Sequence, residues 1–320
     1  MDTDSIEFIV NFEGVGGDQI PNPDTEGDVG VDHYFQMVKR SFAIWDKQGN
    51  LLYGPADNQT IWSDFPGPWD DLGWTDPIVI YDHLADRWLV SCMVYDVNVE
   101  YFEMIAVSAT ADPLGEYYCY SLWFENMPDY PKFGLWPDGY YLTINEAAVE
   151  NNWGTFDGVS ILVFNRAQLI SGDPDPQMLY FHLDAPNQSF VEDISSFLPS
   201  DLDGSPPPEG TPNYHVCIKD DAWGYNEDRL WLWECSVDWN DTANSYFSEV
   251  AVLATDQFDA SWDTLEYIPQ PYSSVRLNSL GHFLMYRLQF REFGDYNTMV
   301  CNHTVRVNNE ERAAVKWYEL

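Results

Sequence analysis

The chain alternates short apolar runs with polar turns, and one such arrangement occurs more than once. The run "DPIVIYDHLADRWLVS", from Asp76 to Ser91, is followed 53 residues later by "DYPKFGLWPDGYYLTIN", from Asp129 to Asn145. Each copy holds an apolar strand, a turn with Asp or Gly, and an aromatic-rich strand, which is the pattern of an antiparallel hairpin. A repeat of roughly 40 to 55 residues is typical of a β-propeller.

Further copies of the repeat extend along most of the chain. Aligned on the second strand, they place large apolar residues at equivalent positions: Tyr34, Trp88, Tyr141, Trp231 and Leu284. Two more strand candidates follow each copy, so each unit predicts one four-stranded antiparallel blade. The sequence therefore predicts an all-β fold, a single β-propeller domain over residues 1–320. Five blades are expected at about residues 20–70, 74–124, 127–206, 212–270 and 274–320.

Two segments do not follow the repeat. The N-terminal run "SIEFIVNFEGV" is a candidate for the strand that closes the ring. The Pro-rich and Gly-rich stretch 187–212 predicts an ordered surface insertion in one blade. Helical periodicity is nearly absent, and only "NRAQLISG", from Asn165, predicts a turn of helix.

Several long runs of the chain resemble a family of uncharacterised secreted bacterial β-propeller proteins. They include "PDTEGDVGVDHYFQMV", "DPIVIYDHLADRWLVS", "PSDLDGSPPP" and "FGDYNTMVCNHTV", in that order. The resemblance covers nearly the whole chain and implies secretion and a propeller fold, but no particular activity. It also implies one or two further blade-like repeats after "VKWYEL", so the closed ring would need more blades than the five recognised here.

The charge balance is strongly acidic and excludes several partners. There are 53 Asp and Glu residues against 14 Lys and Arg, a formal net charge of -39. Without a basic patch, neither nucleic acid nor an anionic membrane surface is an expected partner. Such acidity indicates either a saline, cation-rich medium or simply an acidic secreted surface.

The chain shows no signal for membrane insertion. No run of 18 or more apolar residues occurs. The start "MDTDSIEFIV" has neither a basic nor an apolar signal region, so if the protein is exported its signal has already been removed. We expect an extracellular or cell-surface location. The five cysteines have no metal-ligand spacing and are expected as buried free thiols, with a Cys217–Cys235 bridge as the less favoured alternative.

Four tryptophans in the predicted interblade and strand-connecting loops are candidate sugar platforms: Trp69, Trp74, Trp153 and Trp239. Asp, Asn and Glu residues surround them in sequence. Flat aromatic faces with short polar neighbours suit a carbohydrate, because sugar C–H groups stack on the ring while hydroxyls bond to carboxylates and amides. The alternative is that these rings pack between blades, and for any single Trp it is favoured.

A second candidate group opens the predicted innermost strands and should meet at the mouth of the channel: Asp28, Asp76, Asp129, Asn213 and Arg276. Asn213 and Arg276 are expected to bind ligand. Close carboxylates raise one another's pKa, and a protonated carboxyl beside an ionised one is what glycoside hydrolysis needs. Asp76 and Asp129, with Glu146 as an acid from a loop, form the catalytic hypothesis. The favoured alternative is that each leading Asp accepts backbone N–H bonds in its own turn.

Calcium is the one cofactor that the sequence suggests. Asp24, Glu26 and Asp28 alternate with small residues in "DTEGDVG", a partial oxygen-ligand loop without the distal Glu of an EF-hand. No nucleotide-binding, G-x-S-x-G or H-E-x-x-H motif is present, and the six His lack metal-ligand spacing. No organic cofactor is expected.

Three functions fit the sequence. The first is a secreted or cell-surface propeller that binds a carbohydrate or another surface ligand through its loop-rich face. The second is an extracellular glycoside-active enzyme with paired carboxylates at the channel mouth. The third is a structural module of a larger surface assembly. Carboxylates in an open pocket would favour the enzyme, whereas carboxylates held in turns would favour the binder.

Overall fold

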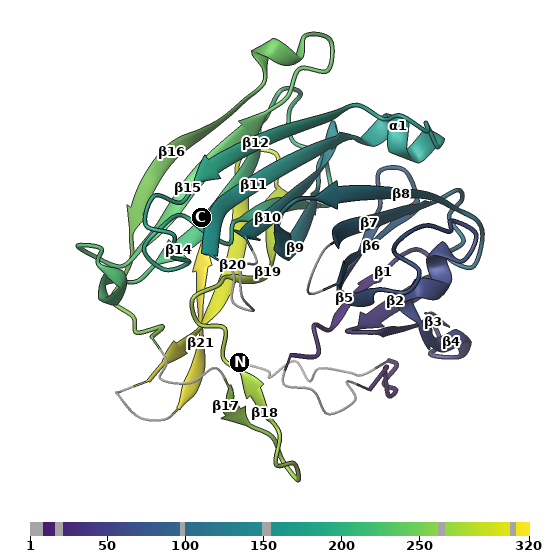
Figure 1. Ribbon diagram of the computed structural model, residues 1–320, viewed down its shortest axis with the longest axis horizontal. Helices are drawn as coiled ribbons and strands as arrows, with labels where there is room; N and C mark the ends of the chain where they lie inside the picture. The colour runs from purple at the N-terminus through teal and green to yellow at the C-terminus, as the bar shows by residue number, and fades with distance from the viewer. Residues whose placement is uncertain (1–8, 17–21, 97–99, 149–154, 262–265, 308–311) are drawn as a thin grey trace.

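The protein is built almost entirely from β-strands. The computed structural model describes residues 9–16, 22–96, 100–148, 155–261, 266–307 and 312–320. An all-β fold made of antiparallel four-stranded sheets was predicted, and it is confirmed for the first three sheets (Figure 1). Short helical elements occur at α1 (Arg166–Ser171), η1 (Asn58–Trp62), η2 (Asp221–Trp223) and η3 (Thr242–Asn244). None of the described helices is long and apolar enough to cross a bilayer.

The first three sheets each contain four consecutive strands in sequence order. The first sheet consists of β1 (Glu26–Val29), β2 (His33–Val38), β3 (Ser41–Asp46) and β4 (Leu51–Asp57). The second consists of β5 (Gly73–Asp82), β6 (Arg87–Asp96), β7 (Glu100–Ser108) and β8 (Tyr117–Phe124). The third consists of β9 (Met127–Leu135), β10 (Gly139–Ala148), β11 (Thr155–Asn165) and β12 (Met178–Asp184). The first and third sheets fall inside predicted blades, and the second begins one residue before its predicted blade, at Gly73.

The C-terminal part differs from the prediction, because the two expected blades form one seven-stranded sheet. Its strands are β13 (Leu198–Asp203), β14 (Asn213–Lys219), β15 (Arg229–Ser236), β16 (Tyr246–Ala254), β19 (Met285–Glu292), β20 (Asn297–Arg306) and β21 (Ala313–Glu319). β13 pairs antiparallel with β14 and parallel with β19, which joins the two halves. β17 (Glu266–Pro269) and β18 (Arg276–Asn278) form a separate hairpin.

The first strand of the fourth unit lies where a surface insertion was expected. β13 belongs to the stretch 187–212, so the predicted boundary between the third and fourth blades is displaced towards the N-terminus. Asn213 consequently begins the second strand of its unit rather than the innermost one. Arg276 begins the short strand β18 of the hairpin and not an innermost strand.

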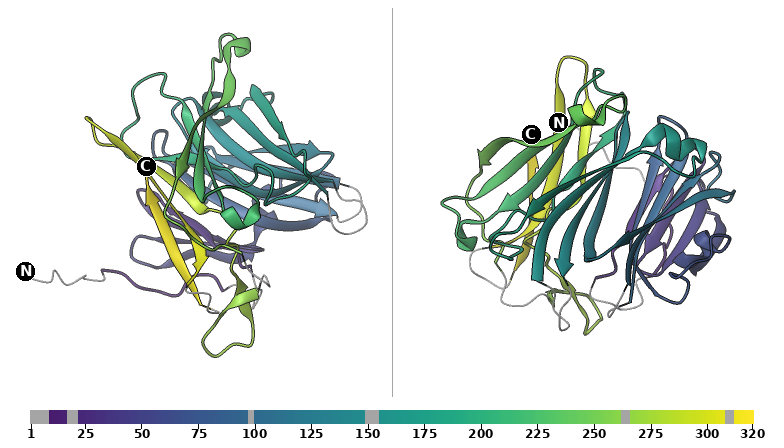
Figure 2. Two further views of the ribbon diagram at one scale, coloured as in Figure 1. Left: turned by 90° about the vertical axis from the view of Figure 1, so that its left-hand side faces the viewer. Right: turned by 45° about the horizontal axis from the view of Figure 1, so that its top comes forward.

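The first strands of successive units lie side by side. β1 contacts β5, β5 contacts β9, and β9 contacts β13, and we call these four the inner strands. β1, β5 and β9 are edge strands of their sheets, whereas β13 lies inside the seven-stranded sheet. Figure 2 shows the sheets next to one another, each turned relative to the last. Buried side chains fill the spaces between them in two clusters, one between the first and second sheets and a larger one that extends from the second sheet through the third to the seven-stranded sheet.

A single arginine of β19 joins the inner strands. Arg287 Nη1 lies 2.9 Å from Asp28 Oδ2 and 3.0 Å from Asp201 Oδ2, and its Nη2 donates to the Val79 carbonyl at 2.6 Å. Asp28 also accepts the Tyr81 backbone N–H at 2.8 Å. The guanidinium therefore links β1, β5, β13 and β19 through charge-assisted hydrogen bonds.

The N-terminal segment does not close a ring in the part that is described. Residues 9–16 form no strand and lie against the first sheet instead. Val15 N–H donates to Gln36 Oε1 at 2.8 Å, and the Phe12 ring packs on Tyr34 and Trp45. The prediction of a closing strand is wrong for these residues, because Phe12 packs on the first sheet while none of the residues 9–16 belongs to a strand.

The cysteines are free thiols, as predicted. Cys92, Cys217, Cys235 and Cys301 are buried, Cys119 is half-buried, and the Cys217–Cys235 bridge is not formed. Burial raises the pKa of Cys217 to about 11, which keeps this thiol protonated and unreactive at neutral pH.

One of the buried histidines, His215, is expected to make the fold sensitive to acid. His215 of β14 is fully buried among the rings of Phe197, Phe247 and Tyr141, and neither ring nitrogen has a hydrogen-bond partner within the described residues. Burial lowers its pKa from 6.5 to about 3. The folded state therefore resists a proton that the unfolded chain accepts below about pH 6.5, and the fold loses stability as the pH falls through that window.

Replacing His215 by phenylalanine should reduce this acid sensitivity. Between pH 7 and pH 5, the loss of unfolding free energy is expected to be smaller than in the wild type by up to about 2 kcal/mol, since the buried histidine no longer competes for a proton. Urea unfolding at the two pH values measures the difference. An unchanged pH dependence in His215→Phe would mean that other groups control the acid response.

Candidate functional site

A pocket opens at the ends of the inner strands. Its volume is about 560 Å³, and it is lined by carboxylates of three successive units: Asp24 and Glu26 at β1, Asp76 of β5 and Asp129 of β9. The opposite wall comes from the segment between Leu277 and Tyr286, which leads into β19. We call this space the inner pocket. Asp76 and Asp129, predicted to meet at the channel mouth, do line one site.

The backbone bends at the same place in three units. Asp24, Asp76 and Tyr130 have φ values of 45°, 48° and 56°, in the left-handed region that non-glycine residues rarely adopt. The pairing of β5 with β6 shifts register between Thr75 and Ile78. A bulge of this kind takes a residue out of the regular ladder and redirects its side chain. These local distortions lie where the acidic side chains meet the inner pocket, the kind of place where backbone strain often accompanies function.

One lysine joins two of the carboxylates. Lys39, from the turn between β2 and β3, bonds to Asp24 Oδ2 and to Asp76 Oδ1, the second contact being 3.1 Å. Thr75 Oγ1 donates a further hydrogen bond to Asp76 Oδ1 at 2.8 Å. Because a single ammonium contacts both side chains, the two carboxyl groups lie within a few ångströms of each other.

The environment drives the pKa values of the carboxyl groups apart. Burial, together with the charge of Asp76, raises the pKa of Asp24 to about 6 and that of Asp129 to about 6. The pKa of Asp76 is lowered: burial opposes this, but the charges of Lys39 and Lys132 and the Thr75 hydrogen bond outweigh it. Burial also raises the pKa of Glu26 to about 7. The inner pocket thus holds one carboxyl group whose ionised form is favoured, Asp76, beside three that can carry a proton close to neutral pH.

Aromatic rings and a second lysine complete the walls. Lys132 Nζ lies 3.9 Å from the centre of the Tyr130 ring and donates to the Pro131 carbonyl. The Tyr130 ring packs on Phe283 with a centroid distance of 4.4 Å, and its hydroxyl donates to the Leu284 carbonyl at 2.6 Å. A pocket with fixed rings on one side and carboxylates on the other suits a small hydroxyl-rich ligand.

Glu146, predicted as the catalytic acid, does not line the inner pocket. It is buried in β10, where its Oε1 accepts hydrogen bonds from the Ser160 hydroxyl at 2.5 Å and the Tyr180 hydroxyl at 2.7 Å. Asn213 is also buried, and its Nδ2 donates to the Ser200 carbonyl at 2.8 Å. Arg276 is exposed on β18 and lies outside the described pocket lining. The structure does not bring these three residues to the carboxylates.

The predicted sugar platforms do not form a common surface. Trp69 and Trp74 are 8% and 7% exposed and belong to the core between the first and second sheets. Trp69 Nε1 donates to the Phe65 carbonyl at 2.9 Å, and its ring stacks on Phe65. Trp239 is half-buried, with Nε1 donating to the Asp138 carbonyl at 2.8 Å. These three show the packing alternative, and Trp153 lies outside the described residues.

The three calcium candidates each face a protein cation. Asp24 bonds to Lys39, Asp28 bonds to Arg287, and Glu26 lies 3.9 Å from the same guanidinium. Calcium requires six to eight oxygen ligands around one point. Because two basic side chains already balance these carboxylates, the arrangement does not fit a shared calcium ion.

A cluster of three aspartates lies in the connection between β14 and β15. Oxygens of Asp220, Asp221 and Asp228 come close enough together to share an ion. Asp220 accepts backbone N–H bonds from Ala222 and Ala260, and Asp228 accepts one from Asp221. These bonds show that the group holds its loops together, which is sufficient to explain it.

Sequence reasoning missed two residues that line the inner pocket, Lys132 and Tyr130, and also Lys39, whose ammonium contacts two of its carboxylates. Their spatial neighbours are distant in sequence, so no motif marks them. One signal was available, because only 14 of the 320 residues are Lys or Arg, and a lysine inside a repeat of so acidic a chain is an unusual choice.

Comparison with known proteins places the chain in no family. No family model matches it, and no curated protein sequence matches it. Three solved structures overlap with it: an arabinanase of Bacillus subtilis (TM-score 0.41, 10% identity, over 92% of this chain and 93% of that one), an exo-beta-1,3-galactanase of Clostridium thermocellum (0.42, 11%, 98% and 62%), and a GH43_1 enzyme of Xanthomonas citri complexed with xylotriose (0.43, 9%, 93% and 86%). Agreement this low establishes neither a common fold nor a common activity.

Proposed function

We propose that the inner pocket binds a saccharide and hydrolyses a glycosidic bond, in a propeller-like protein that acts outside the cell. The observation that carries the proposal is the contrast between Asp76, whose pKa is lowered, and Asp129, whose pKa is raised to about 6, in one open pocket. Hydrolysis of a glycoside requires an ionised carboxylate and a protonated one on either side of the scissile bond.

The contacts favour a division of roles among the three aspartates. Asp76, held ionised by Lys39, acts as the base or nucleophile at the anomeric carbon. Asp129 donates its proton to the departing oxygen as the bond from that oxygen to the anomeric carbon breaks, and water supplies the new hydroxyl and the returning proton. Asp24 is the weaker candidate for the acid, because its bond to the Lys39 ammonium favours the ionised form.

The walls of the inner pocket support a sugar as the ligand. Tyr130, Phe283 and Tyr286 line it, and Lys132 and the carboxylates supply donors and acceptors for hydroxyl groups. Binding through the loop tryptophans, our first hypothesis from the sequence, has less support, because Trp69 and Trp74 are buried.

Release of reducing sugar from a panel of polysaccharides and aryl glycosides tests the proposal. Asp129→Asn is expected to lower kcat by about 10²- to 10⁴-fold on natural glycosides, because general acid catalysis is lost. The loss should be smaller on aryl glycosides with good leaving groups, which need little protonation. For the wild type, kcat/KM should fall as the pH rises through about 6, where Asp129 loses its proton. The Asp129→Asn variant should not show this decrease.

Asp184→Asn provides the matched control, since this side chain is 98% exposed and lies outside the pocket lining. It should leave kcat and the pH profile unchanged. Saccharide binding without turnover of any substrate in the panel would contradict catalysis and leave a binding protein. Absence of both binding and turnover would overturn the proposal as a whole.

A further inference from the structure

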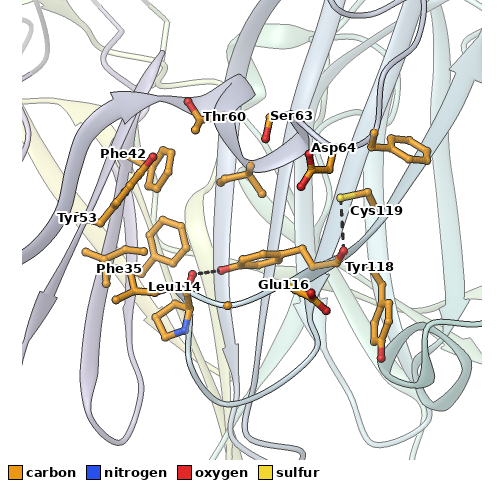
Figure 3. Close-up of a pocket in the computed structure, with 16 residues that line it drawn as sticks. Phe35, Phe42, Tyr53, Thr60, Ser63, Asp64, Leu114, Glu116, Tyr118 and Cys119 are labelled. Atoms are coloured by element: carbon orange, nitrogen blue, oxygen red, sulfur yellow. Dashed lines mark hydrogen bonds between the residues drawn. The ribbon is translucent and has the colours of Figure 1, made fainter.

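A larger pocket lies between the first and second sheets, away from the carboxylates of the inner pocket. Its volume is about 650 Å³. One wall comes from β2, β3 and β4 of the first sheet, and the other from β8 and the turn that leads into it; η1 and the residues after it close one end. We call it the outer pocket (Figure 3). None of the residues assigned to hydrolysis lines it.

The first wall is aromatic and rigid. Phe35 and Phe42 are buried, and their ring centroids are 5.5 Å apart. The Tyr53 ring stacks on Phe42 at the same separation, with an interplanar angle of 27°. On the other wall, Tyr117 donates its hydroxyl to the Pro113 carbonyl at 2.8 Å, which fixes that ring. Ring faces present negative electrostatic potential, so they attract a cation as well as an apolar group.

The charged side chains that line the outer pocket are both acidic. Figure 3 shows the carboxylates of Asp64 and Glu116 across from the rings of Phe35 and Phe42. Both are exposed, and neither makes an ion pair within the described residues. Of the described lining residues, none is Lys, Arg or His. Negative charge is therefore unopposed at this opening.

The negative charge at the opening also affects the thiol of Cys119. Burial and then the charge of Asp64 raise its pKa to about 12, so the carboxylate acts on groups inside the outer pocket. The chain as a whole carries a formal charge of -39, which attracts cations and repels anions over a longer range. Shape and charge thus select for one kind of ligand, a positive group on an apolar body.

We propose that the outer pocket binds a small organic ammonium ion, with its apolar body against the Phe42 and Tyr53 rings and its charge beside Asp64 and Glu116. Rings hold such cations by cation–π attraction, and the carboxylates add Coulombic attraction that salt screens at this exposed opening. The inference is independent of glycoside hydrolysis, because the two pockets share no lining residue.

Calorimetric titration with three ligands of matched aromatic body tests the proposal: benzyltrimethylammonium, neutral benzyl alcohol and anionic benzoate. The wild type should bind the ammonium ion at least tenfold more tightly than the alcohol and should not bind benzoate. The double variant Asp64→Asn, Glu116→Gln should lose at least tenfold in affinity for the cation and bind the alcohol as before. Tyr53→Ala should weaken binding of both the cation and the alcohol.

A second double variant, Glu209→Gln with Asp295→Asn, removes two exposed carboxylates outside the outer pocket and serves as the charge-matched control. It should leave the affinity for the cation unchanged. An equal loss in this control would show that net charge alone attracts the cation and would overturn the site. Equal affinity of the wild type for benzyltrimethylammonium and benzyl alcohol, or no binding of the cation, would overturn it as well.

Discussion

Replacement of Asp76 by asparagine is expected to lower kcat for glycoside hydrolysis by about 10³-fold or more, the largest loss of activity that the inner pocket predicts. Asparagine keeps the size of the side chain and can still accept the hydrogen bonds from Lys39 and Thr75. It removes the negative charge that must attack, or activate water to attack, the anomeric carbon. Lys39 can then pair with Asp24 alone, so the fold should be retained.

The neighbouring carboxyl groups provide a readout that a simple folding defect would not produce. Asp76 is the second cause, after burial, of the raised pKa of both Asp24 and Asp129. In Asp76→Asn both pKa values should fall, which carboxyl-carbon NMR titration can follow. Asp71→Asn, an exposed substitution of the same type outside the pocket lining, should change neither kcat nor these pKa values. If kcat of Asp76→Asn lies within tenfold of the wild-type value, this aspartate is excluded as the attacking group.

The parts of the fold that sequence predicts well are those encoded by local alternation. β5 and β6 show the reason: an apolar run, the tight turn after Asp82, and a second apolar run specify a hairpin without reference to distant residues. The same logic placed Asp76 and Asp129 together, because a position that recurs in each repeat occurs at the same end of each sheet. The packing of the sheets then brought both side chains to one pocket.

The fourth unit was predicted less well because its first strand is defined by distant partners. β13 has the sequence "LPSDLD", which contains proline and two aspartates and has no apolar alternation to mark it. It is a strand because β14 pairs with one part of it and β19, over 80 residues away in sequence, pairs with the other. Lys39 belongs to the same class of missed features, since only folding brings it to Asp76.

The tryptophans show a second limit of sequence reasoning. A Trp beside Asp and Gly in a loop is compatible both with a ligand-binding surface and with packing between two sheets, and the residue type does not distinguish these roles. Trp69 packs between the sheets, because Phe65 and Phe102 contact its ring and the Phe65 carbonyl accepts the hydrogen bond from its indole N–H. Those contacts depend on how the loop folds back onto the second sheet, which no local pattern specifies.

The largest effect on stability is expected from Arg287. Its replacement by methionine should lower the free energy of unfolding by about 3 to 5 kcal/mol, because it leaves the carboxylates of Asp28 and Asp201 beside each other without their cation. It also removes the bond to the Val79 carbonyl that ties β19 to β5. Methionine has a similar length and fills most of the space, so the loss reports charge and hydrogen bonding more than packing.

The pH dependence of that loss separates the electrostatic explanation from a packing defect. Burial raises the pKa of Asp201 to about 6 and that of Glu26 to about 7, while Arg287 acts to lower both. Without the arginine, each folded-state pKa rises further above its unfolded value, so stability present at low pH is lost as the pH rises. Urea unfolding should therefore show a larger deficit in Arg287→Met at pH 8 than at pH 5. Arg291→Met, which replaces an exposed arginine four residues further along β19, should cost less than about 1 kcal/mol at either pH. A deficit in Arg287→Met that is the same at both pH values would assign the loss to packing, and one no larger than in Arg291→Met would show that the inner strands hold together without this guanidinium.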